Sequence, residues 1–363
     1  MSEKIDIKSY NYIELQDYFV QLGEKAFRAK QVYSWLHEKL VTDFTQMTNI
    51  GAALKEKLEA QCYITALTPV EVLESAVDGT KKYLFRLVDG NIIESVFLPY
   101  KHGNSVCIST QVGCRMGCKF CASTLDGLTR NLTTSEMLEE VYRIQTLSGQ
   151  RISHIVLMGA GEPLDNFDNV VKFLEMISDE HGLNISQRNI TLSTCGLVPQ
   201  MKKLAEKDLQ ITLAISLHAS TQETRRELMP IAKRYEISEV IEACRDYFNK
   251  TGRRLTFEYS LVRDVNDTKA EAEKLAKLLA KLNCHVNLIP VNPIKERDFR
   301  ESGAANIANF KNTLEKNGIN VTIRREMGRD INGACGQLRK SYLENKSSFQ
   351  DSRSKRNSAN FEK

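Results

Sequence analysis

Three cysteines stand in one short loop at a spacing suited to iron–sulfur chemistry. Residues 113–121 read GCRMGCKFC, which places thiols at Cys114, Cys118 and Cys121 in a C-x-x-x-C-x-x-C pattern. Most protein 4Fe–4S clusters take four cysteine ligands. Three thiolates leave one iron with an open position, which can bind the amino and carboxylate groups of S-adenosylmethionine (SAM). The loop therefore predicts a cluster that passes one electron to the SAM sulfonium.

A structural zinc site is the alternative interpretation of this loop. Structural zinc takes four ligands, typically as two closely spaced pairs. The next cysteine, Cys195, lies far along the chain and has no second cysteine beside it. The spacing, with the aromatic Phe120 before the last cysteine, instead resembles the radical SAM superfamily. That resemblance implies a 4Fe–4S cluster, SAM and a partial barrel.

The elements that must position this loop alternate along residues 101–342, the region expected to form the catalytic core. Apolar runs predict six strands, at residues 105–110, 154–158, 189–193, 211–217, 255–260 and 286–290. Helical spacing predicts helices at 135–147, 168–177, 198–206, 238–250, 268–282 and 304–317. Repeated strand–helix units indicate a parallel sheet covered by helices. Six units are too few for a closed eight-stranded barrel, so we expect an α/β fold with an open, partial (β/α)6 barrel.

Polar or small residues follow several of these strands, at the edge where barrel active sites lie. After the second strand, Gly161, Glu162 and Pro163 allow close backbone approach to a ligand, and the carboxylate could orient the SAM amino group. Further candidates for SAM contact stand at the ends of the third, fourth and sixth strands: Ser193, Ser216, Leu217, His218 and Asn292. A lone histidine more often has a structural role, but the position of His218 at a strand end favours contact with the ligand.

The flanking regions predict three smaller units. Residues 1–65 are expected to form a small helical domain with scattered Lys and Arg, which indicate either a solvated face or an RNA-contacting module. Residues 66–100 predict a β connector, with a hairpin turn at Asp89-Gly90 and an end at Pro99. Residues 343–363 are polar, without apolar periodicity, and predict a disordered tail.

The composition is that of a globular protein. The 363 residues are 42% hydrophobic and 26% charged, and the net charge of +4 neither requires nor excludes a nucleic-acid partner. No apolar stretch approaches the ~18 residues of a membrane helix, and the start is polar, so we expect a cytoplasmic protein with no membrane partner. In a reducing compartment, nine cysteines suggest metal binding or reactive thiols rather than a disulfide framework.

Two further cysteines lie outside the loop, and their surroundings make a more specific resemblance visible. Cys107 stands in the first core strand, and Cys335 lies in the small-residue run NGACG after the last strand, where it could be a nucleophile or a buried structural residue. With other motifs, they resemble the RlmN family of RNA methyltransferases over nearly the whole chain. These motifs are FRAKQ at 27–31, AST at 122–124, RNLT at 130–133, GEPL at 161–164, SLH at 216–218, LMP at 228–230 and ACGQL at 334–338.

The resemblance implies a reaction at carbon 2 of adenosine, which is too electron-poor to attack SAM directly. It implies that Cys335 takes a methyl group from one SAM, and that a radical made from a second SAM activates the methylated Cys335. The activated group then adds to adenine. Glu94 would remove the proton from carbon 2, and Cys107 would release the crosslink by forming a disulfide with Cys335. The implied substrates are an adenosine in the peptidyl-transferase region of 23S rRNA and one beside the tRNA anticodon.

The same resemblance implies a one-electron donor such as flavodoxin or ferredoxin, and we expect a monomer. Two other functions remain open from the sequence. A Cfr-type enzyme methylates carbon 8 of the same rRNA adenosine with the same cysteines, although Glu162-Pro163 and the run RRE at 324–326 favour carbon 2. The second alternative is a non-catalytic RNA-binding protein with a structural metal.

Overall fold

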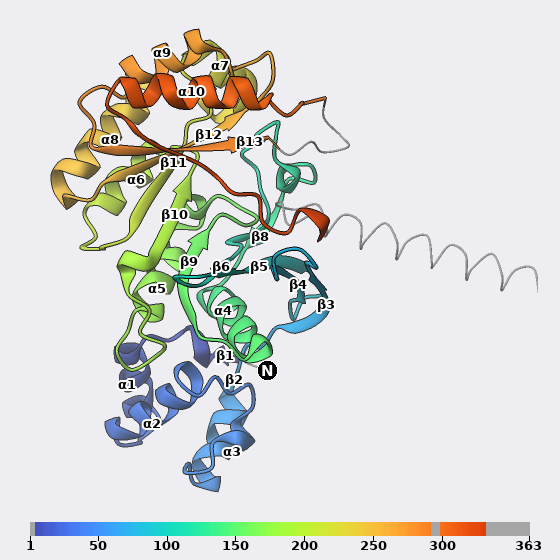
Figure 1. The fold of residues 1–363 in the computed structure, drawn as a ribbon. Coiled ribbons are helices and arrows are strands. Elements are labelled where there is room, and N and C mark those ends of the chain that lie inside the picture. Colours follow the sequence, from blue (N-terminus) through green and yellow to red (C-terminus); the bar gives the residue numbers. More distant parts are fainter. Residues whose placement is uncertain (1–3, 292–297, 332–363) are drawn as a thin grey trace, which may run out of the picture.

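A ten-stranded sheet forms the centre of the molecule (Figure 1). The structure is a computed structural model that describes residues 4–291 and 298–331. The strand order is β14-β13-β12-β11-β10-β9-β6-β5-β4-β3. The six predicted core strands are all present and pair in parallel: β6 (Gly103–Cys107), β9 (Ile152–Leu157), β10 (Ile190–Thr194), β11 (Thr212–Ser216), β12 (Leu255–Leu261) and β13 (Cys284–Pro290). The prediction of an open, partial barrel is therefore confirmed.

The predicted core helices are also present, and they lie outside the curved sheet (Figure 1). They are α4 (Thr134–Ser148), α5 (Phe167–Ile177), α6 (Val198–Ala205), α8 (Ile237–Thr251), α9 (Lys269–Leu278) and α10 (Ala304–Lys316). Local sequence sets their ends. In α4, the Thr133 side chain accepts from the Glu136 amide, and Glu136 accepts from the Thr133 amide, which forms a capping box. The helix ends at Gly149, whose φ of 64° is the left-handed conformation that glycine tolerates.

Besides the short hairpin around the cysteine loop, one strand and one α-helix of the core were not predicted. The strand β14 (Asn320–Ile323) adds a seventh parallel strand beside β13, and the short helix α7 (Gln222–Leu228) follows β11. β14 has alternating apolar residues, Val321 and Ile323, but only Val321 is buried and the strand is only four residues long. In α7 only Arg225 and Leu228 are buried, and the sequence QETRREL shows no apolar stripe.

The β connector continues the main sheet instead of forming a separate unit. Its strands β3 (Thr68–Glu74), β4 (Lys81–Arg86) and β5 (Ile92–Tyr100) pair antiparallel, and β5 then pairs antiparallel with β6. Pro99 does not end the strand as expected, since it lies within β5 opposite Asn104. Pairing with β4 has already ended at Phe97, so a residue without an N–H is tolerated there.

The N-terminal helices α1 (Tyr12–Gln21), α2 (Ala26–His37) and α3 (Ala52–Gln61) match the predicted helical domain. They lie at the end of the molecule away from α10 (Figure 1). The strands β1 (Ile5–Asp6) and β2 (Cys62–Tyr63) pair in parallel, which joins the beginning and the end of this helical region. A fully buried ion pair connects this region to the core, because Lys8 Nζ lies 2.6 Å from Glu139 in α4. The same ammonium donates to the Val41 and Thr65 carbonyls.

The remaining elements are short. The hairpin of β7 (Gln111–Gly113) and β8 (Leu128–Asn131) encloses the cysteine loop. Single 3-10 turns occur at Ile7–Ser9, Phe44–Gln46, Ala122–Thr124, Pro163–Asn166, Gln187–Asn189, Pro230–Lys233 and Arg329–Ile331. The predicted tail lies outside the described residues. Within the described ranges, no helix has both the length and the apolar composition needed to span a membrane.

Candidate active site

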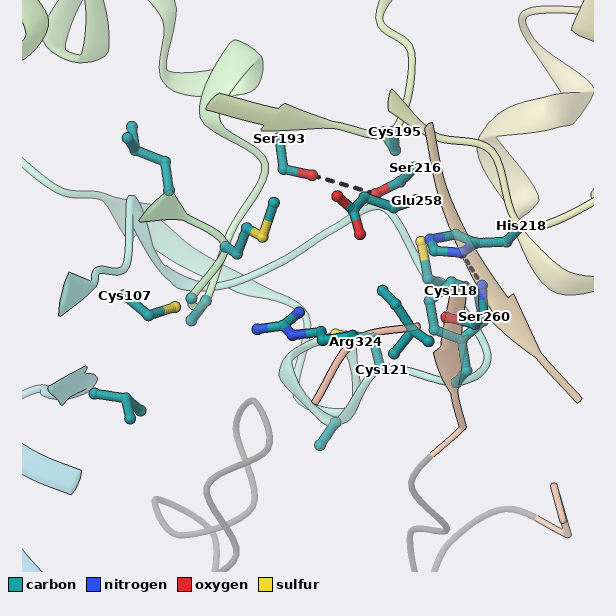
Figure 2. Close-up of a pocket in the computed structure, with 18 of the residues that line it drawn as sticks. Cys107, Cys118, Cys121, Ser193, Cys195, Ser216, His218, Glu258, Ser260 and Arg324 are labelled. Carbon is teal, nitrogen blue, oxygen red and sulfur yellow. Dashed lines mark hydrogen bonds between the residues drawn. The ribbon is translucent and has the colours of Figure 1, made fainter. Parts of the chain in front are cut away.

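A cavity of about 500 Å³ opens at the carboxyl ends of the parallel strands (Figure 2). Most of the predicted site residues line it: Glu94, Cys107, Cys114, Cys118, Cys121, Gly161, Glu162, Pro163, Ser193, Ser216 and His218. Leu217 is fully buried and is not among the lining residues. Asn292 and Cys335 lie outside the described residues. Residues from Cys107 to His218 are brought together because parallel strands end at one edge of the sheet. Glu94 joins them from the adjoining antiparallel strand β5.

The cysteine loop is held from both sides. On one side, the Cys114 amide donates to the Gly127 carbonyl at 2.9 Å within the β7–β8 hairpin. Gly113 has a φ of +76°, and a Cβ there would collide with that carbonyl, so only glycine fits. On the other side, the Lys119 amide donates to the Leu228 carbonyl at the end of α7. The loop is thus fixed before any ligand binds.

The three thiols fit the role of cluster ligands. Cys114 and Cys118 are buried, while Cys121 is partly exposed. Burial raises the pKa of the Cys114 thiol to about 12 and that of Cys118 well above its ordinary value. Thiolates in this position therefore need bound metal to compensate their charge. Among residues 4–291 and 298–331, no group of three His, Cys, Asp or Glu side chains lies close enough to hold a single metal ion. A four-iron cluster is larger than one ion, so its ligands are spaced further apart.

Glu162 is braced by backbone amides. Its Oε1 accepts from the Leu164 amide at 3.1 Å, and its Oε2 accepts from the Cys195 amide at 2.8 Å. Burial raises the pKa of its carboxyl group, although these hydrogen bonds oppose that effect. Glu162 thus ties the loop after β9 to the end of β10. Contact between Glu162 and the SAM amino group stays a prediction. Such a contact would use the remaining lone pairs of the Glu162 carboxylate.

Gly161 is required by its surroundings. Its φ is +108°, and a Cβ would lie 2.7 Å from the Cβ of Gln111. The Gln111 side chain also accepts from the Glu162 amide at 2.9 Å. The backbone of this loop therefore follows a path that any larger side chain would displace.

His218 is a neutral hydrogen-bond donor. Its Nδ1 accepts from the Ser260 amide at 2.9 Å, so the ring proton must be on Nε2. Burial, with the nearby charge of Arg225, lowers its pKa to about 3. The ring packs edge-on against Phe120, with centroids 4.6 Å apart. The hydroxyls of Ser193 and Ser216 lie 3.4 Å apart on the same side of the cavity (Figure 2).

Glu94 and Cys107 come from neighbouring strands. Val96 of β5 is paired with Cys107 of β6, and side chains two residues apart on a strand share a face, so Glu94 points to the same side. The Glu94 Oε2 lies 3.0 Å from Nζ of Lys82, and the exposed fractions of the two side chains are 9% and 0%. A buried ammonium therefore stands beside the carboxylate.

The sequence analysis did not single out Glu258, a charged residue that lines the cavity. The side chain of Glu258 in β12 points into the cavity, and it accepts from the Asn287 amide group at 2.8 Å (Figure 2). Burial raises its pKa, and Arg324, beyond β14, opposes that effect. A glutamate inside the otherwise apolar run LTFEYSL was the signal that could have indicated Glu258.

Comparisons with known proteins agree with this arrangement. The family model described as "Ribosomal RNA large subunit methyltransferase N-terminal domain" matches residues 5–64. The model described as "Radical SAM superfamily" matches residues 108–279. These matches confirm the predicted superfamily, whose members use a 4Fe–4S cluster and SAM. The protein is therefore an enzyme with both cofactors.

Full-length relatives extend the match over nearly the whole chain. A protein of Lachnoclostridium phytofermentans, named "Probable dual-specificity RNA methyltransferase RlmN", is 62% identical over 95% of this chain and 97% of its own length. A Clostridium perfringens protein of the same name is 57% identical over 94% and 98%. The crystal structure of a radical SAM methyltransferase from Sphaerobacter thermophilus matches with a TM-score of 0.88 and 41% identity, over 92% of this chain and 98% of that one. The chain therefore belongs to the RlmN family of dual-specificity RNA methyltransferases.

Proposed function

We propose that this enzyme methylates carbon 2 of adenosine in 23S rRNA, in the peptidyl-transferase region, and in tRNA, beside the anticodon. The observation that supports this most is the convergence of Glu94, Cys107 and the three-cysteine loop on one cavity. A base and a thiol are the groups this reaction needs next to a radical source. The methyl-carrying residue of the proposal is Cys335, which lies outside the described residues.

The chain's own residues would bind and orient the cofactors. Cys114, Cys118 and Cys121 would hold the cluster, and the loop containing Gly161 and Glu162 would bind the methionine part of SAM. The remaining SAM contacts in the proposal are Pro163, Ser193, Ser216, Leu217, His218 and Asn292. When bound, the cofactors supply one electron, a methyl group and a carbon-centred radical. The neutral His218 offers only its Nε2–H, so it would donate to an acceptor atom of SAM.

Two residues would complete the reaction on the RNA. The Glu94 carboxylate would accept the proton from carbon 2, and the Lys82 ammonium 3.0 Å away would hold that carboxylate in place. Cys107 would attack the sulfur that links Cys335 to the adenine. The disulfide formed between Cys107 and Cys335 would release the methylated RNA.

The surface offers two basic regions for RNA. Arg324, Arg325 and Arg329 are exposed and line the cavity, where phosphates flanking the target adenosine would pass. In the N-terminal domain, Lys39 stands 3.8 Å above the Trp35 ring, and Arg28 stands 4.9 Å above the Phe27 ring. We propose that these basic and aromatic groups contact RNA backbone and unstacked bases. A flavodoxin- or ferredoxin-type donor, a monomeric state and a cytoplasmic location complete the proposal.

The release step gives the proposal a direct test. The Cys107→Ala enzyme, supplied anaerobically with reductant, SAM and an rRNA fragment, should accumulate protein covalently attached to RNA. Denaturing gel electrophoresis and mass spectrometry of the crosslinked nucleoside would locate the bond. A matched control is Cys244→Ala, which removes a buried thiol from α8 outside the cavity lining. Normal turnover of Cys107→Ala without a crosslink, or a bond at carbon 8, would contradict the proposal.

A further inference from the structure

Arg225 is a fully buried cation behind the cysteine loop. It lies in α7, and its side chain has no solvent exposure. Its Nη2 donates to the Cys195 carbonyl at 2.7 Å and its Nη1 to the Tyr235 carbonyl at 3.2 Å. Its Nε has no hydrogen-bond partner. The guanidinium is thus held in place by neutral groups alone.

A buried positive charge without an anion is costly, and arginine is always charged in proteins. Within residues 4–291 and 298–331, no carboxylate forms an ion pair with Arg225, whereas neighbouring Arg226 pairs with Glu236 on the surface at 3.0 Å. The titratable groups close enough to interact with the guanidinium are the thiols of Cys118, Cys195 and Cys244, together with His218. His218 is neutral, which leaves the charge of Arg225 without compensation by a carboxylate among the described residues.

The cysteine loop would provide that compensation. The Lys119 amide, next to Cys118, is hydrogen-bonded to the carbonyl of Leu228 at the end of α7, so the helix and the loop form one packed unit. Cluster binding converts three thiols to thiolates and releases their protons. The cluster core offsets only part of this negative charge, and reduction by a one-electron donor adds one negative charge without a proton.

We propose that Arg225 is the counter-cation of the cluster, and that its charge makes the cluster easier to reduce. This inference rests on the proposed assignment of Cys114, Cys118 and Cys121 as the cluster ligands. Arg225 is a positioning residue in this role, because it acts on the cluster through its field and does not touch the substrate. In a dry, low-dielectric site, a fixed charge has a larger effect than the same charge at the surface.

Two neighbouring arginines allow a matched experiment. Arg225→Met removes the buried charge and keeps an unbranched side chain, whereas Arg226→Met removes the same charge from the surface of the same helix. Arg225→Lys keeps the charge but changes the contacts with the two carbonyls. Each variant is reconstituted anaerobically, its iron and sulfide are measured, and the reduction potential of the cluster is determined by spectroscopic titration. Thermal denaturation of each cluster-free protein serves as the folding control.

We expect Arg225→Met to fold and to shift the reduction equilibrium at least tenfold toward the oxidised cluster, which is about 59 mV for one electron. Arg225→Lys should keep most of the wild-type potential, and Arg226→Met should keep all of it. Failure to load a cluster in Arg225→Met alone would also support the proposal.

Three results would overturn it. A loaded Arg225→Met enzyme with the wild-type potential would show that the charge does not act on the cluster. If Arg225→Lys failed to fold, or folded without loading a cluster, the two carbonyl contacts rather than the charge would explain the residue. Failure of the wild-type and Arg226→Met proteins to bind iron and sulfide would instead contradict the proposed cluster site itself.

Discussion

Replacing Lys82 with methionine should impair the proposed base without removing it. The ion pair between Lys82 and Glu94 is almost dry, with side-chain exposures of 0% and 9%. Removing one partner of a buried ion pair costs roughly 3–5 kcal/mol, because the other charge stays buried without compensation. Because Glu94 keeps some contact with solvent, we expect about 2–3 kcal/mol of this to appear as lost positioning of the Glu94 carboxylate for proton transfer. That range corresponds to a roughly 30- to 150-fold fall in the rate of RNA methylation.

The step that slows identifies the effect. Glu94 acts on the RNA, so Lys82→Met should lower the rate of RNA methylation and leave the methylation of Cys335 intact. Initial rates of methyl incorporation into an rRNA fragment, measured with saturating SAM, would show this. Mass spectrometry should still find Cys335 methylated, since Glu94 takes no part in that step.

The adjacent residue supplies the control. Lys81 pairs with Glu74 at 3.1 Å, but the two side chains are 28% and 59% exposed. Exposed pairs contribute at most about 1 kcal/mol, so Lys81→Met should leave the rate unchanged. A wild-type rate of RNA methylation for Lys82→Met would contradict the role of Lys82 in holding Glu94.

Three further outcomes follow from buried groups. Lys8→Met leaves Glu139 without its buried ammonium and should lower the free energy of unfolding by about 3 kcal/mol, against under about 1 kcal/mol for the exposed Lys57→Met, as measured by urea denaturation. Gly161→Ala should weaken SAM binding at least tenfold in equilibrium dialysis, because its Cβ would meet Gln111, while Gly51→Ala, with open space around it, should not. Burial raises the pKa of Glu140 in α4. The residue therefore contributes most to stability below its unfolded pKa, and that contribution is lost as the pH rises. In thermal denaturation, Glu140→Gln should gain stability relative to wild type as the pH goes from acidic to neutral. A Glu140→Gln protein that loses stability over that range would contradict this sign.

The sequence predicted the elements whose burial is regular. Strands such as β11 appear as apolar runs because helices cover the sheet. Cys114, Cys118 and Cys121 are recognisable because these candidate ligands lie close together in the chain. The strand β14 carries the alternating run Asn-Val-Thr-Ile, but it has only four residues and takes its place in the sheet by pairing with β13. A local pattern this short indicates a strand only once its partner in the sheet is known.

The charged residues of the site show the same division. Lys81 and Lys82 are adjacent and identical in type, yet only Lys82 is buried, because the alternation of β4 turns it toward Glu94. Arg225 and Arg226 form a second such pair, since one faces the cysteine loop and the other faces solvent. Composition and spacing cannot separate the members of either pair. Only the register of a strand or the packing of a helix assigns one of them to the site.

Methylation of carbon 2 of adenosine in both RNA classes can be tested directly in cells. The measurement is nucleoside mass spectrometry of 23S rRNA and tRNA from cells that lack the endogenous activity, with and without the gene for this protein. We expect 2-methyladenosine in both RNAs only when the protein is present, and no 2-methyladenosine when Cys335 is replaced by alanine. The appearance of 8-methyladenosine without 2-methyladenosine, or no methylation of either RNA, would contradict the proposed function.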